Sequence, residues 1–315
     1  MPDWTDRQLP EGDEVFLDHV GFFVADLEVA GERLRRLGFD VSPVNLQMNL
    51  DAEGRLVPSG TSNRLAVLRR GFLEVLAATH AAPLAAQLEA ALRRHAGLHL
   101  IAFSHADIPA TRARLVAEGI AMQPVVRLRR HRETPQGVRE VAWSVLRPEP
   151  GTMPEGRVQF AYCHTPDLTW TPGAPAPGNG ADGLGDLLVC VEDARAAATR
   201  LSGYVARAAS HREGRSDVAL DRGRLVLVEP ATAARMLPGF VPAPAPFIAG
   251  QALRADLAAA RAALVRGGVA PLHAHDDLIC VGPADALGGH LLFHGPELRD
   301  PWGALAGGGA ASAGA

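Results

Sequence analysis

The sequence contains few cysteines. There are three in 315 residues, Cys163, Cys190 and Cys280, and no two of them form a CxxC pair. This spacing indicates neither a disulfide framework nor a thiolate zinc site, and a reducing, cytoplasmic location is therefore the default expectation. No run of the sequence approaches the ~18 apolar residues of a membrane helix, and residues 1–14 lack the apolar stretch of a signal peptide. We expect no membrane partner.

The sequence also lacks an excess of positive charge. A formal net charge of −4 gives the chain no general attraction to nucleic acid. Hydrophobic residues at 47% and charged residues at 21% are typical of a globular protein and exclude a disordered one. A chain of this length suits two domains of about 150 residues each.

A pattern that occurs four times is the strongest feature of the sequence. An apolar strand leads to an aspartate, then to a helical stretch, and then to a glycine. The aspartate and the glycine are 12, 12, 10 and 12 residues apart in the four copies, which are Asp26 to Gly38, Asp107 to Gly119, Asp193 to Gly203 and Asp256 to Gly268. Aspartate is a preferred helix N-cap and glycine a common helix stop, so each copy predicts a strand followed by a helix of about three turns.

Candidate strands follow each of these helices, as in residues 64–68 and 72–76, which predict a hairpin. The sequence therefore predicts an α+β protein of four βαβββ modules, paired into two domains because one module leaves a sheet face bare. A segment rich in proline and glycine, residues 171–180, divides the modules two and two. We expect an N-terminal domain over 14–172, a C-terminal domain over 180–298 and a flexible tail over 299–315.

Several stretches resemble the glyoxalase-like branch of the vicinal oxygen chelate superfamily, and each occupies a definite place in the modules. They are His19 in the first strand, residues 60–64 before the third, residues 72–76 as the fourth, and residues 164–170 at the end of module two. The resemblance covers residues 14–172 well and 183–296 only as degenerate modules. It implies two paired modules that enclose a cup with a divalent metal ion (Zn, Fe, Mn, Ni or Mg) at its floor.

The resemblance also implies metal ligands on the first and fourth strands, which are His19 and Glu74 in module one. The alternative for His19 is a core histidine bonded to a carbonyl, and the alternative for Glu74 is a solvent-facing residue on an edge strand. Glu74 is also the candidate catalytic residue. Asn63 and Tyr162 are the candidate substrate-binding residues.

Module two offers no histidine opposite His19, where alignment of the aspartate caps places Leu100. His164 near the fourth strand is the preferred third ligand. His99 is the alternative if a bulge turns it to the same sheet face, and His164 otherwise caps the turn before Pro166.

The second domain has lost these positions, since Asp186 stands where His19 does and Val226 where Glu74 does. We expect this half to pack, to dimerise or to cover the first cup. A basic run over residues 127–132 is interpreted as a solvated edge strand or as a recognition patch for an anionic group of the substrate.

These observations favour a metal-dependent enzyme that acts on a small oxygen-rich molecule. Lyase or isomerase chemistry through a metal-stabilised enolate comes first, and ring-cleaving dioxygenation second, because two histidines and one carboxylate also suit ferrous iron. The alternative is a metal-free protein that binds or sequesters a small molecule. The expected partners are the small-molecule substrate and, in a homodimer, a second copy of the chain.

Overall fold

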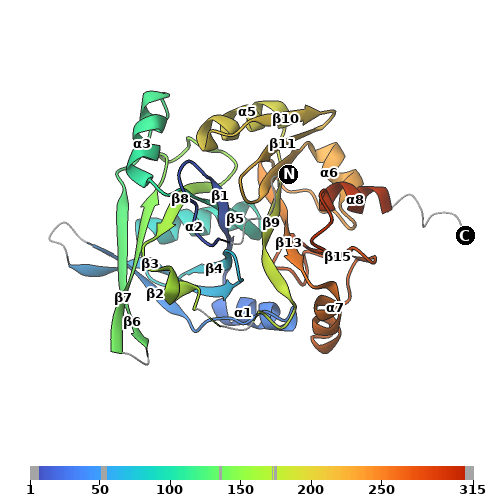
Figure 1. Cartoon of the computed structure of the whole chain (residues 1–315), viewed down its shortest axis with the longest axis horizontal. Helices are drawn as coiled ribbons and strands as arrows, with labels where there is room; N and C mark the ends of the chain where they lie inside the picture. Colours follow the sequence, from blue (N-terminus) through green and yellow to red (C-terminus); the bar gives the residue numbers. More distant parts are fainter. Residues whose placement is uncertain (1–6, 51–54, 135–136, 172, 174–175, 309–315) are drawn as a thin grey trace, which may run out of the picture.

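The structure, a computed structural model, describes residues 7–50, 55–134, 137–171, 173 and 176–308 (Figure 1). The first half contains two βαβββ modules. Module one comprises β1 (Phe16–Phe23), α1 (Leu27–Arg36), β2 (Asn45–Leu50), β3 (Leu56–Val67) and β4 (Phe72–Ala78). After the connecting helix α2 (Pro83–Arg94), module two comprises β5 (Gly97–Ser104), α3 (Ile108–Ala117), β6 (Val126–Thr134), β7 (Gly137–Leu146) and β8 (Arg157–Cys163), and the short helix α4 (Pro166–Thr169) follows.

The second half repeats this order with shorter strands. Module three comprises β9 (Ala181–Cys190), α5 (Ala194–Val205), β10 (Ala209–Arg212), β11 (Arg215–Ala219) and β12 (Arg224–Val228), followed by α6 (Pro230–Met236). Module four comprises β13 (Phe247–Ala255), α7 (Leu257–Arg266), β14 (His273–Ala274), β15 (Leu278–Val281) and β16 (His290–His294), followed by α8 (Pro301–Gly308).

The strands pair in the same way in every module. The first strand lies parallel to the fourth, and the third and second follow outward. First strands then pair antiparallel, β1 with β5 and β9 with β13, so modules one and two share one sheet and modules three and four another. The pairing of Ile248 of β13 with Leu98 of β5 joins the two sheets, and isolated bridges link Phe16 to Arg222 and Arg70 to Gly183. The prediction of an α+β fold of four βαβββ modules, paired two and two, is confirmed.

The four predicted aspartate caps are confirmed. The side chains of Asp26, Asp107, Asp193 and Asp256 each accept hydrogen bonds from backbone N–H groups in the first turn of their helix. The predicted stop at Gly203 is wrong. Helix α5 continues to Val205 and ends at Ala206, which adopts the left-handed conformation with φ of 52°.

The two faces of the sheets bury different cores. Residues such as Val20, Phe22 and Leu187 face the outer helices in one large cluster. The concave face of the C-terminal sheet is filled by apolar side chains from its own chain, among them Met236 of α6 and Trp302 of α8. Figure 1 shows α6 and α8 side by side at that end of the molecule, and the two helices are in contact.

The expectation of a flexible tail from residue 299 is wrong for residues 301–308, which form α8. Trp302 is fully buried and belongs to the apolar cluster that fills the C-terminal sheet, so burial of this one indole ties the segment down. Residues 309–315 lie outside the described part of the chain. The predicted domain boundaries stay predictions, and residues 172, 174 and 175 of the expected linker also lie outside the described part.

A loop of the C-terminal domain runs beside the first strand of the N-terminal domain. The Leu17 N–H donates to the carbonyl of Arg222, which lies between β11 and β12, at 2.8 Å. The guanidinium of Arg222 is buried and lies 4.3 Å from the centre of the Phe16 ring. Close packing here requires glycine at position 223, because a Cβ on Gly223 would lie 2.7 Å from Leu17 Cβ.

Within the described residues, no helix has both the length and the apolar character needed to cross a membrane.

Candidate functional site

The candidate site lies on the concave face of β1, β4, β5 and β8, which we call the N-terminal cup. The registers of these strands place two rows of residues across its floor. One row runs from Phe72 through His19 and Ala102 to Gln159, and the other from Glu74 through Gly21 and Leu100 to Arg157. Strands β2 and β6, at the two outer edges, are in contact, so the two walls close toward each other (Figure 1).

His19 is buried and is held from behind by Asp18. The Asp18 Oδ2 atom accepts a hydrogen bond from His19 Nδ1 at 2.7 Å, and the carboxylate is fully buried. The pairing of β1 with β5 has a β-bulge between Leu17 and His19. This bulge lets the side chains of Asp18 and His19, which are adjacent in sequence, face each other. The proton on Nδ1 leaves a lone pair on Nε2, and that nitrogen lies 3.4 Å from Nε2 of Gln159 in the cup.

Glu74 is also buried in the cup, where two amides hold its carboxylate. Its Oε1 atom accepts hydrogen bonds from Asn63 Nδ2 at 2.6 Å and from Gln47 Nε2 at 3.2 Å. His19 and Glu74 therefore share one sheet face, in adjacent rows. Asn63 contacts Glu74 through its amide nitrogen, and its buried Oδ1 has no hydrogen-bond partner in the described part of the chain, so its role in substrate binding stays a prediction.

Aromatic side chains form one wall beside His19. The His19 imidazole stacks on Phe72 with 4.2 Å between ring centroids, and Trp143 meets it edge-on at 6.4 Å. Trp170 packs against both Phe72 and Trp143, and its indole N–H donates to the carbonyl of Gly71. This wall fixes the imidazole plane and excludes water from one side of it.

The structure does not bring His164 or Tyr162 to the cup. Ser144 lies opposite Tyr162 in the register of β7 and β8, and its hydroxyl is 2.8 Å from His164 Nε2. Tyr162 packs against the outer core, on the opposite face from Gln159. The prediction of His164 as third ligand is wrong. Side chains along a strand alternate between the two faces, and Tyr162 and His164 lie two and four positions after the outward-facing Phe160, so they share its face.

His99, the alternative third ligand, lies at the far end of the cup. A register shift in β1 falls between Gly21 and Phe22, and His99 stacks on Phe23 with ring centroids 4.9 Å apart. Its Nε2 donates to the carbonyl of His95 at 2.9 Å. Burial is the main cause that lowers the pKa of His99, to about 4, so the ring is neutral near pH 7.

Gln159 is the site residue that sequence reasoning missed. It stands opposite Ala102 in β8, as Glu74 stands opposite Gly21 in β4. Alignment of the two aspartate caps superposes Gly21 and Ala102, but the same count carries Glu74 to Glu155, because the segment from the cap to the fourth strand is four residues longer in module two. The register of β8 was therefore needed to identify Gln159. The Oε1 of Gln159 accepts a hydrogen bond from Arg147 Nε at 3.0 Å.

A comparison with known protein families matches residues 17–205, well over half of the chain, to the glyoxalase-like domain. The chain belongs to the glyoxalase-like domain family. The resemblance to the glyoxalase-like branch of the vicinal oxygen chelate superfamily is thereby confirmed.

Solved structures share the fold of this glyoxalase-like protein at low sequence identity. A hypothetical protein from Staphylococcus aureus is 10% identical, with a TM-score of 0.61 over 89% of this chain and 99% of that chain. A mutant of 4-hydroxymandelate synthase from Streptomyces coelicolor is 15% identical, with a TM-score of 0.56 over 93% of this chain and 96% of that one. A search of curated proteins finds no match.

The family's four ligand positions hold a set of side chains that does not fit a divalent ion. They are occupied here by His19, Glu74, Leu100 and Gln159. Leucine has no donor atom, and the bond from Arg147 to Gln159 Oε1 turns the amide NH₂, not the oxygen, toward His19. No cluster of three or more His, Cys, Asp or Glu side chains that could hold a metal is present among the described residues.

The charge in the cup also opposes a cation. The half-buried guanidiniums of Arg130, Arg147 and Arg157 all act electrostatically on the single carboxylate of Glu74. A divalent ion would add to this positive charge in a poorly solvated space. A carboxylate behind His19 is compatible with a metal-ligating histidine as well as with a general base. It is therefore the other ligand positions, Leu100 and Gln159, that do not fit a metal.

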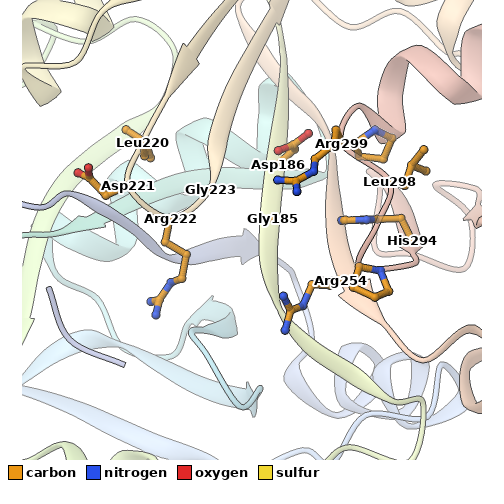
Figure 2. Close-up of a pocket in the computed structure, with 12 residues that line it drawn as sticks. Gly185, Asp186, Leu220, Asp221, Arg222, Gly223, Arg254, His294, Leu298 and Arg299 are labelled. Carbon is orange, nitrogen blue, oxygen red and sulfur yellow. The ribbon is translucent and has the colours of Figure 1, made fainter. Parts of the chain in front are cut away.

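The C-terminal domain has a shallow cleft, open to solvent, at one end of its own concave face (Figure 2). Asp186, at the position of His19, lines it and forms a buried ion pair with Arg224. His294 also lines it, donates through Nδ1 to the carbonyl of Gly295 at 2.8 Å, and has a pKa that burial lowers to about 4. The position equivalent to Glu74 is Val226, as predicted, and it lies in the apolar filling.

Proposed function

We propose that this protein is an isomerase or lyase that moves a proton on a small oxygen-rich molecule in the N-terminal cup, without a divalent metal. The observation that carries the proposal is the bond from His19 Nδ1 to the buried carboxylate of Asp18, with Nε2 left toward the cup. A histidine held in this tautomer by a carboxylate is a typical general base.

The chemistry follows from the neutral imidazole and the amide beside it. His19 Nε2 takes a proton from a carbon next to a carbonyl group, the C–H electron pair moves toward the carbonyl oxygen, and an enolate forms. The NH₂ group of Gln159, oriented by Arg147, is the hydrogen-bond donor in place to stabilise that oxygen. Return of the proton to either face gives isomerisation, and loss of a leaving group on the adjacent carbon gives elimination.

Asp18 acts on the substrate only through His19. Its carboxylate stabilises the imidazolium that forms when Nε2 takes the proton, and it keeps the second proton on Nδ1 throughout. Phe72 and Trp143 hold the ring plane, so the direction of the Nε2 lone pair is set before substrate enters. Ring-cleaving dioxygenation, the second reaction predicted from the sequence, is not proposed because it depended on a ligand set with His164.

The test is exchange of substrate C–H protons with solvent deuterium, followed by proton NMR. A panel of small oxo-acids and hydroxy-acids is incubated with the full chain in D₂O. We expect the wild type to exchange the proton next to the carbonyl of at least one compound, and His19→Ala to slow that exchange about 100-fold or more. His131→Ala, on the outer face of β6, is the matched control and should exchange at the wild-type rate.

Two outcomes would overturn this proposal. Exchange that disappears after dialysis against a chelator and returns with a stoichiometric divalent ion would establish the metal-dependent enzyme predicted from the sequence. Saturable binding of panel compounds without exchange in the wild type would establish the small-molecule-binding protein that was the alternative prediction.

A further inference from the structure

Three arginines of the N-terminal cup have no carboxylate close to them. Arg130 of β6, Arg147 after β7 and Arg157 of β8 are half-buried. Among the described residues, no carboxylate oxygen lies within 4 Å of these guanidiniums, and the one hydrogen bond that they form is from Arg147 to Gln159. Arg157 stands opposite Leu100 on the cup face, one row away from Gln159. Arg147 directly follows β7, which pairs with β8, so the two arginines lie on one wall of the cup.

Other poorly exposed arginines of the chain are differently placed. Arg64, Arg70, Arg215 and Arg224 each form an ion pair with a carboxylate. Arg222 donates to the carbonyls of residues 7 and 8 and lies over the Phe16 ring. Half-buried Arg112 likewise donates to a carbonyl, that of Gln123. These arginines therefore each have a hydrogen-bond or ion-pair partner, whereas Arg130 and Arg157 have neither among the described residues.

The missing partner has an electrostatic cost that the structure displays. Burial, with a smaller contribution from the charge of Arg157, lowers the pKa of Arg147 to about 9. Burial also lowers the pKa values of Arg157 and Arg130. The carboxylate that partly offsets them is Glu74, which stands across Gly21 and Leu100 from Arg157 and is bonded to the amides of Asn63 and Gln47.

We propose that Arg147 and Arg157 form an oxyanion-binding site, which takes a carboxylate or phosphate group of the ligand. This inference rests on the proposed function, in which His19 is the base. A ligand whose anionic group binds these arginines would extend over Gly21, with its reacting carbon near His19. Guanidinium groups bind such oxyanions with two parallel N–H donors, and burial strengthens the bond. The substrate class is then a small molecule with a terminal oxyanion and a carbonyl group near it.

Arg147 also connects the proposed anion site to the amide of Gln159. Its Nε is used by Gln159, so its remaining N–H groups are the ones that face the anion, and one side chain links the anchor to the amide beside His19. Arg130, opposite Val141 on the cup side of β6, adds positive charge from the edge of the cup. The basic run of residues 127–132 thus contributes one arginine to recognition, while Arg129 pairs with Glu140 outside.

The experiment is calorimetric titration of the full chain with inorganic phosphate and, separately, with malonate, at constant ionic strength set with sodium chloride. We expect saturable binding of at least one of the two anions, and the preferred one identifies the group as phosphate or carboxylate. Arg147→Met and Arg157→Met should each weaken that binding about tenfold or more. Arg129→Met, also a loss of one positive charge but outside the cup, should bind as the wild type does.

Two further measurements keep the outcomes distinct. Melting curves without ligand should show Arg157→Met at least as stable as the wild type, since removal of an unpaired buried charge relieves a cost. His19→Ala should retain anion binding while it loses deuterium exchange, so a failure of the proposed function leaves the anion site standing. Absence of saturable binding, or equal binding by wild type, Arg147→Met and Arg157→Met, would overturn the proposed anion site.

Discussion

Asp186 pairs with Arg224 across β9 and β12 in the same strand register in which His19 stacks on Phe72 across β1 and β4. The ion pair is almost entirely shielded, with 3% and 8% of the two side chains exposed. Asp300, just before α8, extends this pair into a network, since it contacts Arg224 and also pairs with Arg215. The position that carries the candidate base in one domain carries a structural ion pair in the other.

Loss of one member of this pair should destabilise the protein strongly. Arg224→Met leaves the carboxylate of Asp186 buried without its partner, and we expect the free energy of unfolding to fall by about 3–5 kcal/mol. The double variant Asp186→Leu with Arg224→Met removes both charges and should recover a large part of that loss. Urea unfolding of the two single variants and the double variant measures the coupling, and additive losses would contradict the prediction.

Replacement of Asp18 should impair proton transfer without removing the base. Asp18→Asn can still contact Nδ1 but no longer stabilises a positive imidazolium, so we expect the deuterium exchange rate to fall about 100-fold. Nitrogen NMR of the His19 ring should show the proton on Nδ1 in the wild type and a changed tautomer ratio in Asp18→Asn. Phosphate or malonate affinity is the control and should stay within about twofold of the wild type, since Asp18 contacts His19 and forms no hydrogen bond or ion pair with Arg147 or Arg157 in the described structure.

Trp302 should be essential to the stability of the C-terminal domain. The indole is fully buried in the apolar filling of the concave face, next to residues such as Met236. Trp302→Ala creates a cavity there, and we expect a loss of about 3–5 kcal/mol in the free energy of unfolding. Leu298→Ala, on the partly buried rim of the same cluster, is the comparison and should cost less. Similar denaturation midpoints for Trp302→Ala and the wild type would show that α8 does not hold the filling together.

Stability should decrease as the pH falls from about 6.5 to about 4, in part because of His294. Burial lowers the pKa of this side chain to about 4 in the folded protein, and the charges of Arg254 and Arg224 contribute. The unfolded chain therefore binds a proton in this pH range that the folded chain does not, which favours unfolding. The loss from this residue is about 3 kcal/mol at most. Melting temperatures of the wild type and His294→Gln, measured from pH 7 to pH 4, should show a shallower decrease for the variant.

The repeat of caps and strands made the fold predictable from the sequence. Asp26, Asp107, Asp193 and Asp256 mark helix starts whose hydrogen bonds are local, so the chain segment alone determines them. The end of α5 was less predictable because Gly203 fits within the helix and Ala206 takes the left-handed stop. The burial of Trp302 could not be predicted, since a tail rich in glycine and alanine gives no signal of the cavity that one indole fills.

The site was predictable only where module one supplied it. His19 and Glu74 share the cup face as expected, because strand alternation and register follow from the hydrophobic pattern. In module two, the expectation of a histidine ligand led to the prediction of His164, whereas the strand register places Gln159 and Arg157 on the cup face. The role of Asp18 depends on a bulge that turns it toward its neighbour, and a bulge leaves no clear mark in one sequence.

The loop between β11 and β12 makes the second half of the chain indispensable to the first. It supplies the carbonyl that satisfies the Leu17 amide and, through Asp221, the carboxylate that accepts from Val15 N–H at 2.7 Å. The C-terminal pair has Asp186 and Val226 in place of His19 and Glu74, yet its loop completes the strand that carries Asp18 and His19. A chain shortened to the first two modules would therefore leave the N–H groups of Val15 and Leu17 without these acceptors, next to the floor of the cup.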